Sequence, residues 1–88
     1  MKYRKKPVVI EAIQYTGNNY EEIRDFVGKI LKVTHITPYI PKLIIETLEG
    51  DHIVSVNDFV IKGVHGEFYA CKPDIFRETY EEVFEDEK

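Results

Sequence analysis

The sequence predicts an α+β fold, with a mostly antiparallel, curled sheet or small half-open barrel and one short amphipathic helix. Most of the chain consists of short β-branched or alternating runs, separated by turns rich in glycine, proline and asparagine. Only one stretch, 20–27, repeats its apolar residues at helical spacing. The connections in the second half are short, which favours consecutive antiparallel strands.

Length and composition predict a single globular domain over 1–88. The chain has 88 residues, of which 43% are hydrophobic and 32% charged, so it is too apolar for disorder. A domain this short buries roughly 60–65% of the surface its unfolded chain exposes. Its core is therefore thin, and stability is expected to depend in part on a partner or on self-association.

The first half predicts a strand, a helix and a second strand. Residues 8–15 follow Pro7 and carry apolar groups on both faces, which predicts a central or doubly covered strand. Residues 29–36 alternate and predict the second strand, and the two prolines in 37–41 predict an extended connection after it.

The helix is predicted over 20–27. Asn18 is the expected N-cap, with Glu21 three residues later as in a capping box. Tyr20, Ile23, Val27 and Ile30 form the apolar stripe, and Gly28 is the expected stop.

The second half predicts a meander of strands and a short helical turn. Strands are expected over 42–48, 52–56, 59–64, 67–71 and 80–84, with turns at 49–51, 57–58 and 65–66. A single helical turn is expected over 72–77, because Pro73 suits the first helical position and Asp74 suits the positive end of the helix dipole.

The residue types that act as catalytic or metal-binding groups in other proteins have structural explanations in this sequence. His35, His52 and His65 are not spaced as metal ligands, and Cys71 has no activating base beside it in sequence. The carboxylate pairs lie at a helix start, a hairpin and an edge, and no phosphate-binding glycine pattern occurs. We therefore predict a protein that is not an enzyme, with no catalytic residue, no metal site and no cofactor.

The ends of the chain differ in charge. A basic N-terminal arm occupies 1–6 and an acidic C-terminal tail occupies 85–88, within a net charge of −4. With one cysteine and no apolar run near the roughly 20 residues that span a bilayer, we expect a cytoplasmic protein without membrane contact. The acidic balance makes nucleic acid a poor partner, since duplex binding needs many phosphate contacts.

The stretch 58–77 is the candidate binding surface. Polar groups collect there around a hairpin and the helical turn: Lys62, His65, Glu67, Tyr69, Lys72, Asp74 and Arg77. If Phe68 and Ala70 face the core, alternation displays Tyr69 outward, as at many interaction surfaces. The alternative is that Tyr69 covers a neighbouring strand.

Three separated motifs also carry a resemblance. KYRKKPVVIEAIQY, IETLEGDHIVSVNDFVIKGVHGEFYACKPDIF and ETYEEV resemble a group of small bacteriophage and prophage proteins of unknown function with a GVxGExYxCKPDIF module, here residues 63–76. That group often has Pro-Gly-Asp where this chain has Val56-Asn57-Asp58, a turn that Asn57 suits because asparagine tolerates positive φ. The resemblance implies a phage origin and a bacterial host cytoplasm, and it carries over no site residue. The module itself is equally consistent with a folding signature.

The leading hypothesis is a non-enzymatic accessory protein that binds a host or phage protein, as a homo-oligomer. One alternative is a small-ligand or nucleotide binder at a subunit interface, with Lys62, Lys72 and Arg77 for charge and Tyr69 for stacking. Another is a weak nucleic-acid binder through the basic arm.

Overall fold

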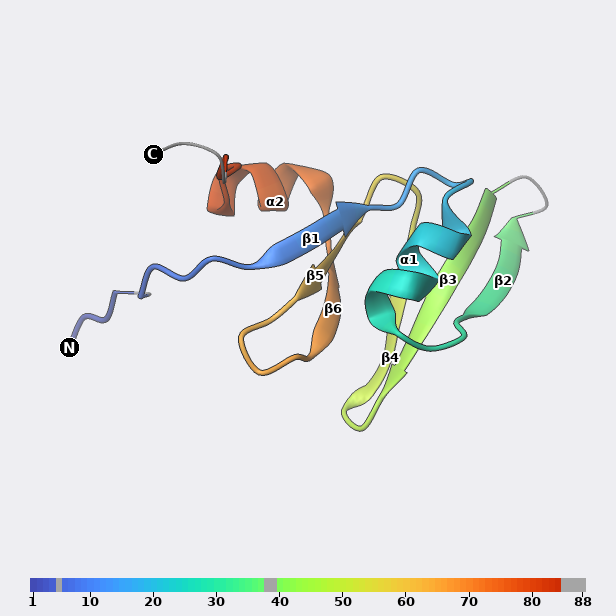
Figure 1. The fold of residues 1–88 in the computed structure, drawn as a ribbon, viewed down its shortest axis with the longest axis horizontal. Coiled ribbons are helices and arrows are strands. Elements are labelled where there is room, and N and C mark those ends of the chain that lie inside the picture. The colour runs from blue at the N-terminus through green and yellow to red at the C-terminus, as the bar shows by residue number, and fades with distance from the viewer. Residues whose placement is uncertain (5, 38–39, 85–88) are drawn as a thin grey trace.

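The described residues form two three-stranded antiparallel sheets and two helices (Figure 1). The structure is a computed structural model that describes residues 1–4, 6–37 and 40–84, with only the backbone of 35–37 and 40. The elements in chain order are β1 (Glu11–Gln14), α1 (Tyr20–Val27), β2 (Lys32–Thr37), β3 (Ile40–Thr47), β4 (Gly50–Val54), β5 (Phe59–Lys62), β6 (Phe68–Cys71) and α2 (Pro73–Thr79).

The α+β prediction is confirmed, but the strands do not form one curled sheet or a barrel. The first sheet has the order β1-β5-β6 and the second has the order β2-β3-β4, with β4 and β6 in contact between them. The predicted meander is interrupted between β4 and β5. There Asn57 takes a φ of 78° and donates its N–H to the Tyr15 carbonyl, while the Asp58 carboxylate accepts the Ser55 N–H. This turn directs β5 away from β4 and onto β1.

The main core lies between the two sheets and α1. Ile23 and Val27 of α1 are buried there against side chains from both sheets and from the residues beside them: Tyr15, Leu31, Leu43, Ile45, Val54 and Val60. Phe26 and Phe68 pack at its border, edge to face, with ring centroids 5.5 Å apart. The apolar stripe of the sequence therefore does face the core, except that Ile30 follows the helix and is 84% exposed.

The opposite face of the first sheet carries α2. Phe76 of α2 stacks on Phe59 of β5 with ring centroids 3.9 Å apart, and Tyr80 follows at 5.0 Å from Phe76. Ile61, two residues from Phe59 on the same strand face, is fully buried yet lies outside the main core cluster. The first sheet thus has a second, smaller apolar layer on its α2 side.

The bounds of α1 match the prediction, and Gly28 ends the helix with a φ of 85°. The predicted cap is wrong by one residue, because Asn19 rather than Asn18 precedes the first turn. The Asn19 side chain accepts the Thr16 N–H at 2.8 Å and donates to Glu22 at 2.8 Å. It therefore fixes the turn before the helix and leaves no side-chain bond to the helix backbone.

The first strand is shorter than predicted and lies at a sheet edge, not at the centre. Its first residue, Glu11, pairs with Lys62, the last residue of β5. Residues 8–10 therefore have no partner in β5. The predicted strand 80–84 is also wrong, since 80–84 carries no strand assignment. The helical turn predicted over 72–77 is a full helix that ends at Thr79, and the turn predicted at 49–51 lies at 48–49.

Several other bounds shift by a few residues. The strand expected from 29 begins at Lys32, and β3 already includes Pro41, which the sequence placed in a connection. The predictions for Lys5 of the basic arm, for residues 38–39, for the side chain of His35 and for the acidic tail 85–88 fall outside the described residues.

Candidate functional site

An open apolar groove runs along β1 and is lined by side chains from three parts of the chain. Its volume is about 1080 Å³. Residues 7–13 form one wall, and residues from α2 and from 81–83 form the other, with Phe26 of α1 at the end. Figure 1 shows the N-terminal segment extending beyond the first sheet on the side where α2 lies.

Hydrogen bonds to β5 fix which backbone groups of β1 face this groove. The Tyr15 N–H donates to the Asp58 carbonyl at 2.8 Å, and the Tyr15 carbonyl accepts from Asn57. In an antiparallel pair the residues alternate, so the backbone groups of Ile13 and Glu11 also point toward β5. The N–H and C=O groups of Ala12 and Gln14 then point outward, at the edge that no described strand covers. The Gln14 carbonyl already accepts a hydrogen bond from the Asn19 side chain at 2.9 Å, so the uncovered groups are those of Ala12 and the Gln14 N–H.

The groove carries exposed apolar side chains on both walls. Val9 is 77% exposed on the N-terminal side, and Val83 is 60% exposed on the C-terminal side. Val8, which also lines the groove, is about half exposed. Exposed apolar side chains beside an unpaired strand edge are typical of a binding surface, because monomeric proteins rarely expose large apolar patches.

Opposite charges flank the same groove. Lys2, Arg4 and Lys6 are exposed on the segment that leads into residues 7–13. Glu81 and Glu82 line the opposite wall. The groove therefore has an apolar floor, an anionic rim and a cationic extension from its N-terminal wall.

Six of the seven residues of the predicted surface lie near the two ends of β6. Lys62, His65 and Glu67 belong to the β5–β6 hairpin, where the Glu67 carboxylate accepts the His65 N–H at 2.9 Å. At the other end, Lys72, Asp74 and Arg77 belong to the start and body of α2. The fold separates these two groups by the length of the strand, with Tyr69 between them.

Within the α2 group, the charged side chains have different surroundings. The Lys72 ammonium lies 3.8 Å from the carboxylate of Asp58, which is buried. Asp74 is exposed in the first turn of α2, and Arg77 lines the apolar groove. Arg77 is thus the one residue of the predicted set that belongs to this groove.

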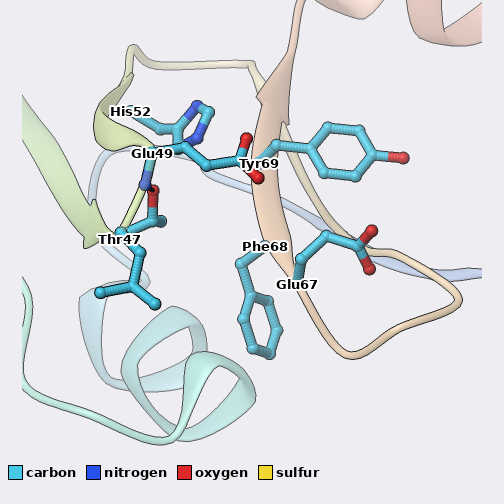
Figure 2. Close-up of a pocket in the computed structure, with 7 residues that line it drawn as sticks. Thr47, Glu49, His52, Glu67, Phe68 and Tyr69 are labelled. Atoms are coloured by element: carbon cyan, nitrogen blue, oxygen red, sulfur yellow. Dashed lines mark hydrogen bonds between the residues drawn. The ribbon is translucent and has the colours of Figure 1, made fainter.

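Phe68 and Ala70 pack against the main core, and Tyr69 is half-buried on the opposite face of β6 (Figure 2). Burial raises the pKa of Tyr69 to about 12, and a hydrogen bond with Tyr80 contributes to the same increase. Burial also raises the pKa of the Cys71 thiol, and the charges of Asp58 and Asp74 add to that effect. The thiolate form of Cys71 is therefore disfavoured, which does not suit a nucleophile.

A second hollow of about 500 Å³ lies between the β3–β4 hairpin and β6 (Figure 2). It is lined by Thr47, Leu48, Glu49, His52, Glu67, Phe68 and Tyr69. Figure 2 shows Phe68 directed toward α1, with Glu67 and Tyr69 directed to the other side of β6. None of these lining residues is a lysine or arginine, and within the described part of the chain no three metal-binding side chains form a cluster.

Sequence reasoning missed most of the groove. The available signal was the run Pro7-Val8-Val9-Ile10, whose β-branched residues precede the ladder and continue the strand pattern. What the sequence could not show was that β5 stops opposite Glu11 and leaves this run uncovered.

Comparison with protein-family models, with curated proteins and with solved structures found no match to this chain. The resemblance to small phage proteins therefore stays a prediction. Of the helices within the described residues, neither is long and apolar enough to cross a membrane.

Proposed function

We propose that this chain is a small phage or prophage accessory protein that acts in the host cytoplasm by binding another polypeptide, without catalysis. The phage assignment is supported by the motifs of residues 2–15, 45–76 and 78–83 alone. The binding role is supported by the groove along β1.

The observation that carries the proposal is the combination of an open strand edge with apolar walls. Ala12 offers an outward N–H and C=O and Gln14 an outward N–H, as in domains that bind an extended peptide as an added strand. In such complexes the backbone bonds supply affinity, and side-chain pockets on the flanks supply specificity. Phe26 and Phe76 flank the groove here and are suited to that second role.

The hollow beside β6 supports a weaker alternative, a small-ligand site. Glu49 and Glu67 give it an acidic lining, which favours a neutral or cationic ligand over a nucleotide. The cations expected to hold a nucleotide, Lys62, Lys72 and Arg77, do not line it. A thermal-shift screen with nucleotides, cyclic dinucleotides and polyamines tests this site, and no shift at millimolar ligand would exclude it.

Nucleic-acid binding through the basic arm receives less support. Lys2, Arg4 and Lys6 are exposed, but the wall opposite their segment carries Glu81 and Glu82. Phosphate groups would be repelled there, and the chain as a whole has a net charge of −4.

Site-directed photo-crosslinking in bacterial lysate tests the binding role. Val9→Cys, in a Cys71→Ser background, is purified and labelled with a cysteine-directed photo-crosslinker, which places the probe in the groove wall. Ile30→Cys is the matched control, because Ile30 is an apolar residue after α1 that is 84% exposed and does not line the groove. We expect polypeptide adducts from position 9 and few from position 30.

Equal labelling from both positions, or none from position 9, would contradict a binding role for the groove. Circular dichroism of the two labelled proteins verifies that each is folded before the comparison is made.

A further inference from the structure

We infer that the polypeptide which occupies the groove is an extended segment whose alternate residues are basic, and that these basic residues face the wall formed by α2 and residues 81–83. The inference rests on the proposed function, because it specifies the partner at the same groove. It follows from the pairing of β1, from the backbone groups that β1 leaves uncovered and from the charges of the two walls.

The pairing of β1 decides which of its side chains face α2. Ala12 pairs with Ile61, which lies on the same face of β5 as Phe59. Phe59 in turn stacks on Phe76 of α2. Because the side chains of directly paired residues share a face of the sheet, Ala12 lies on the α2 face. Ile13, the next residue, packs against the main core on the α1 face.

The backbone groups of β1 then fix the orientation of the bound strand. Ala12 leaves both its N–H and its C=O uncovered, and Gln14 leaves its N–H. Both pairings within the first sheet are antiparallel, so we take the same direction for the bound strand. In an antiparallel pair, the residue that exchanges hydrogen bonds with Ala12 also has its side chain on the same face as Ala12. The residues that bond to β1 are therefore those whose side chains face α2.

The α2 wall is anionic at its exposed end. Glu81 and Glu82 are exposed and line the groove, and Arg77 is the only cation among its described lining residues. Neither carboxylate has a hydrogen bond or ion pair with another described residue. The cations of the basic arm precede the groove and do not line it. A lysine or arginine of the bound strand suits this wall, because its aliphatic stem covers apolar side chains while its charge reaches the two carboxylates.

The α1 side of the groove is apolar. Phe26 lines it, and the ring packs edge to face on Phe68. Glu11 lies on this side as well, but it pairs across the strands with Lys62, an opposite charge within the same sheet. The residues of the bound strand that face α1 are therefore apolar, and basic and apolar residues alternate along it.

Fluorescence anisotropy with defined peptides tests this pattern. The probe is a fluorescein-labelled peptide of ten residues that alternates lysine and valine, added to the purified protein. We expect saturable binding that weakens at high salt. A glutamate–valine peptide of the same length should bind at least about tenfold more weakly. A third peptide, with the lysines and valines in two separate blocks, tests whether alternation itself is required, and it should also bind more weakly.

Two double variants locate the charge. Glu81→Gln with Glu82→Gln should weaken binding of the lysine–valine peptide by about 2–30-fold, since each exposed charge pair contributes modestly. Glu49→Gln with Asp51→Asn is the matched control. It removes the same charge from exposed residues of the β3–β4 hairpin, which do not line the groove, and should leave binding unchanged. Equal weakening by both pairs would mean that only net charge attracts the peptide, and would overturn the inference.

Two N-methylated peptides test the orientation of the bound strand. Methyl groups on the backbone nitrogens of two central lysines remove donors that face β1, so they should abolish binding. Methyl groups on two central valines lie on the side away from β1 and should be tolerated. The reverse result would place the basic residues on the α1 side and overturn the inference.

The remaining outcomes separate this inference from the proposed function. No binding of the lysine–valine peptide at millimolar concentration, or equal binding of the glutamate–valine peptide, would overturn the inference. Adducts from position 9 in the photo-crosslinking experiment would still support the binding role, and their absence would overturn that role as well. A stable dimer by light scattering that binds no peptide would assign the groove to a second copy and also overturn the inference.

Discussion

The two helices pack on opposite faces of the first sheet, and they differ in what holds them. α1 buries Ile23 and Val27 in the core shared by both sheets. α2 has no fully buried residue and is held by the stack of Phe76 on Phe59. Segments with few buried contacts open at lower free-energy cost than a core. The groove therefore adjoins the less firmly held helix, which suits a surface that must admit another chain.

The largest effect is expected in the shared core. Ile45 is fully buried in the second sheet, so Ile45→Ala should lower the free energy of unfolding by about 2–5 kcal/mol. Urea unfolding, followed by circular dichroism, measures this change. Ile53→Ala is the control, because Ile53 is half exposed on the neighbouring strand and should cost under about 1 kcal/mol. Similar values for the two variants would contradict the assigned core.

A smaller effect is expected on the α2 side. Phe76→Ala removes the ring stacked on Phe59, but Phe76 is only half-buried, so we expect a loss of about 1–3 kcal/mol. Hydrogen exchange should show faster exchange in α2 and unchanged protection in α1. Equal loss of protection in both helices would mean that the two form one cooperative unit, and the contrast between them would disappear.

Alkaline pH should weaken the α2 side next. The folded-state pKa of Tyr69 is about 12, against 10.0 for an ordinary tyrosine. A raised folded pKa gives stability that is fully present below pH 10 and is lost as the pH rises toward 12. The midpoint of urea unfolding should therefore decrease over this pH range, and Tyr69→Phe should make that decrease smaller. A residual fall is expected from Tyr15, whose pKa is raised by burial. Identical pH profiles in both proteins would contradict the assignment.

The smallest effect is expected at the tip of the β5–β6 hairpin. A Cβ on Gly63 would lie 2.3 Å from the Glu67 carboxylate, the mobile end of a side chain. Gly63→Ala should therefore displace that carboxylate from the His65 N–H and cost under about 1 kcal/mol. In a Glu67→Ala background the same change should be close to neutral. A cost that persists there would point to backbone constraint instead.

The sequence could predict the elements that the core requires, because buried residues leave a periodic pattern. α1 was predictable to its ends, since its apolar stripe, its polar face and Gly28 agree. α2 was predicted as one turn only, because a helix without buried residues leaves no such stripe. The division into two sheets depends on how far Asn57 and Asp58 rotate the chain, which strand patterns do not encode.

The candidate site was less predictable than the fold for a related reason. A polar cluster such as Lys62 to Arg77 can be recognised in the sequence. A groove depends on which strands and helices leave a surface uncovered, and the sequence does not show that directly. Val8 and Val9 look like buried strand residues, and only the end of β5 at Lys62 shows that they are exposed.

The pairing of β1 with β5 also sets an order of events during synthesis. Ile13 pairs with Val60, which follows it by roughly 50 residues, and ribosomes add about 5–20 residues per second. The first strand to leave the ribosome therefore waits roughly 2–10 s for its partner. During that interval both of its edges are open, and on a polysome neighbouring nascent chains present the same strand.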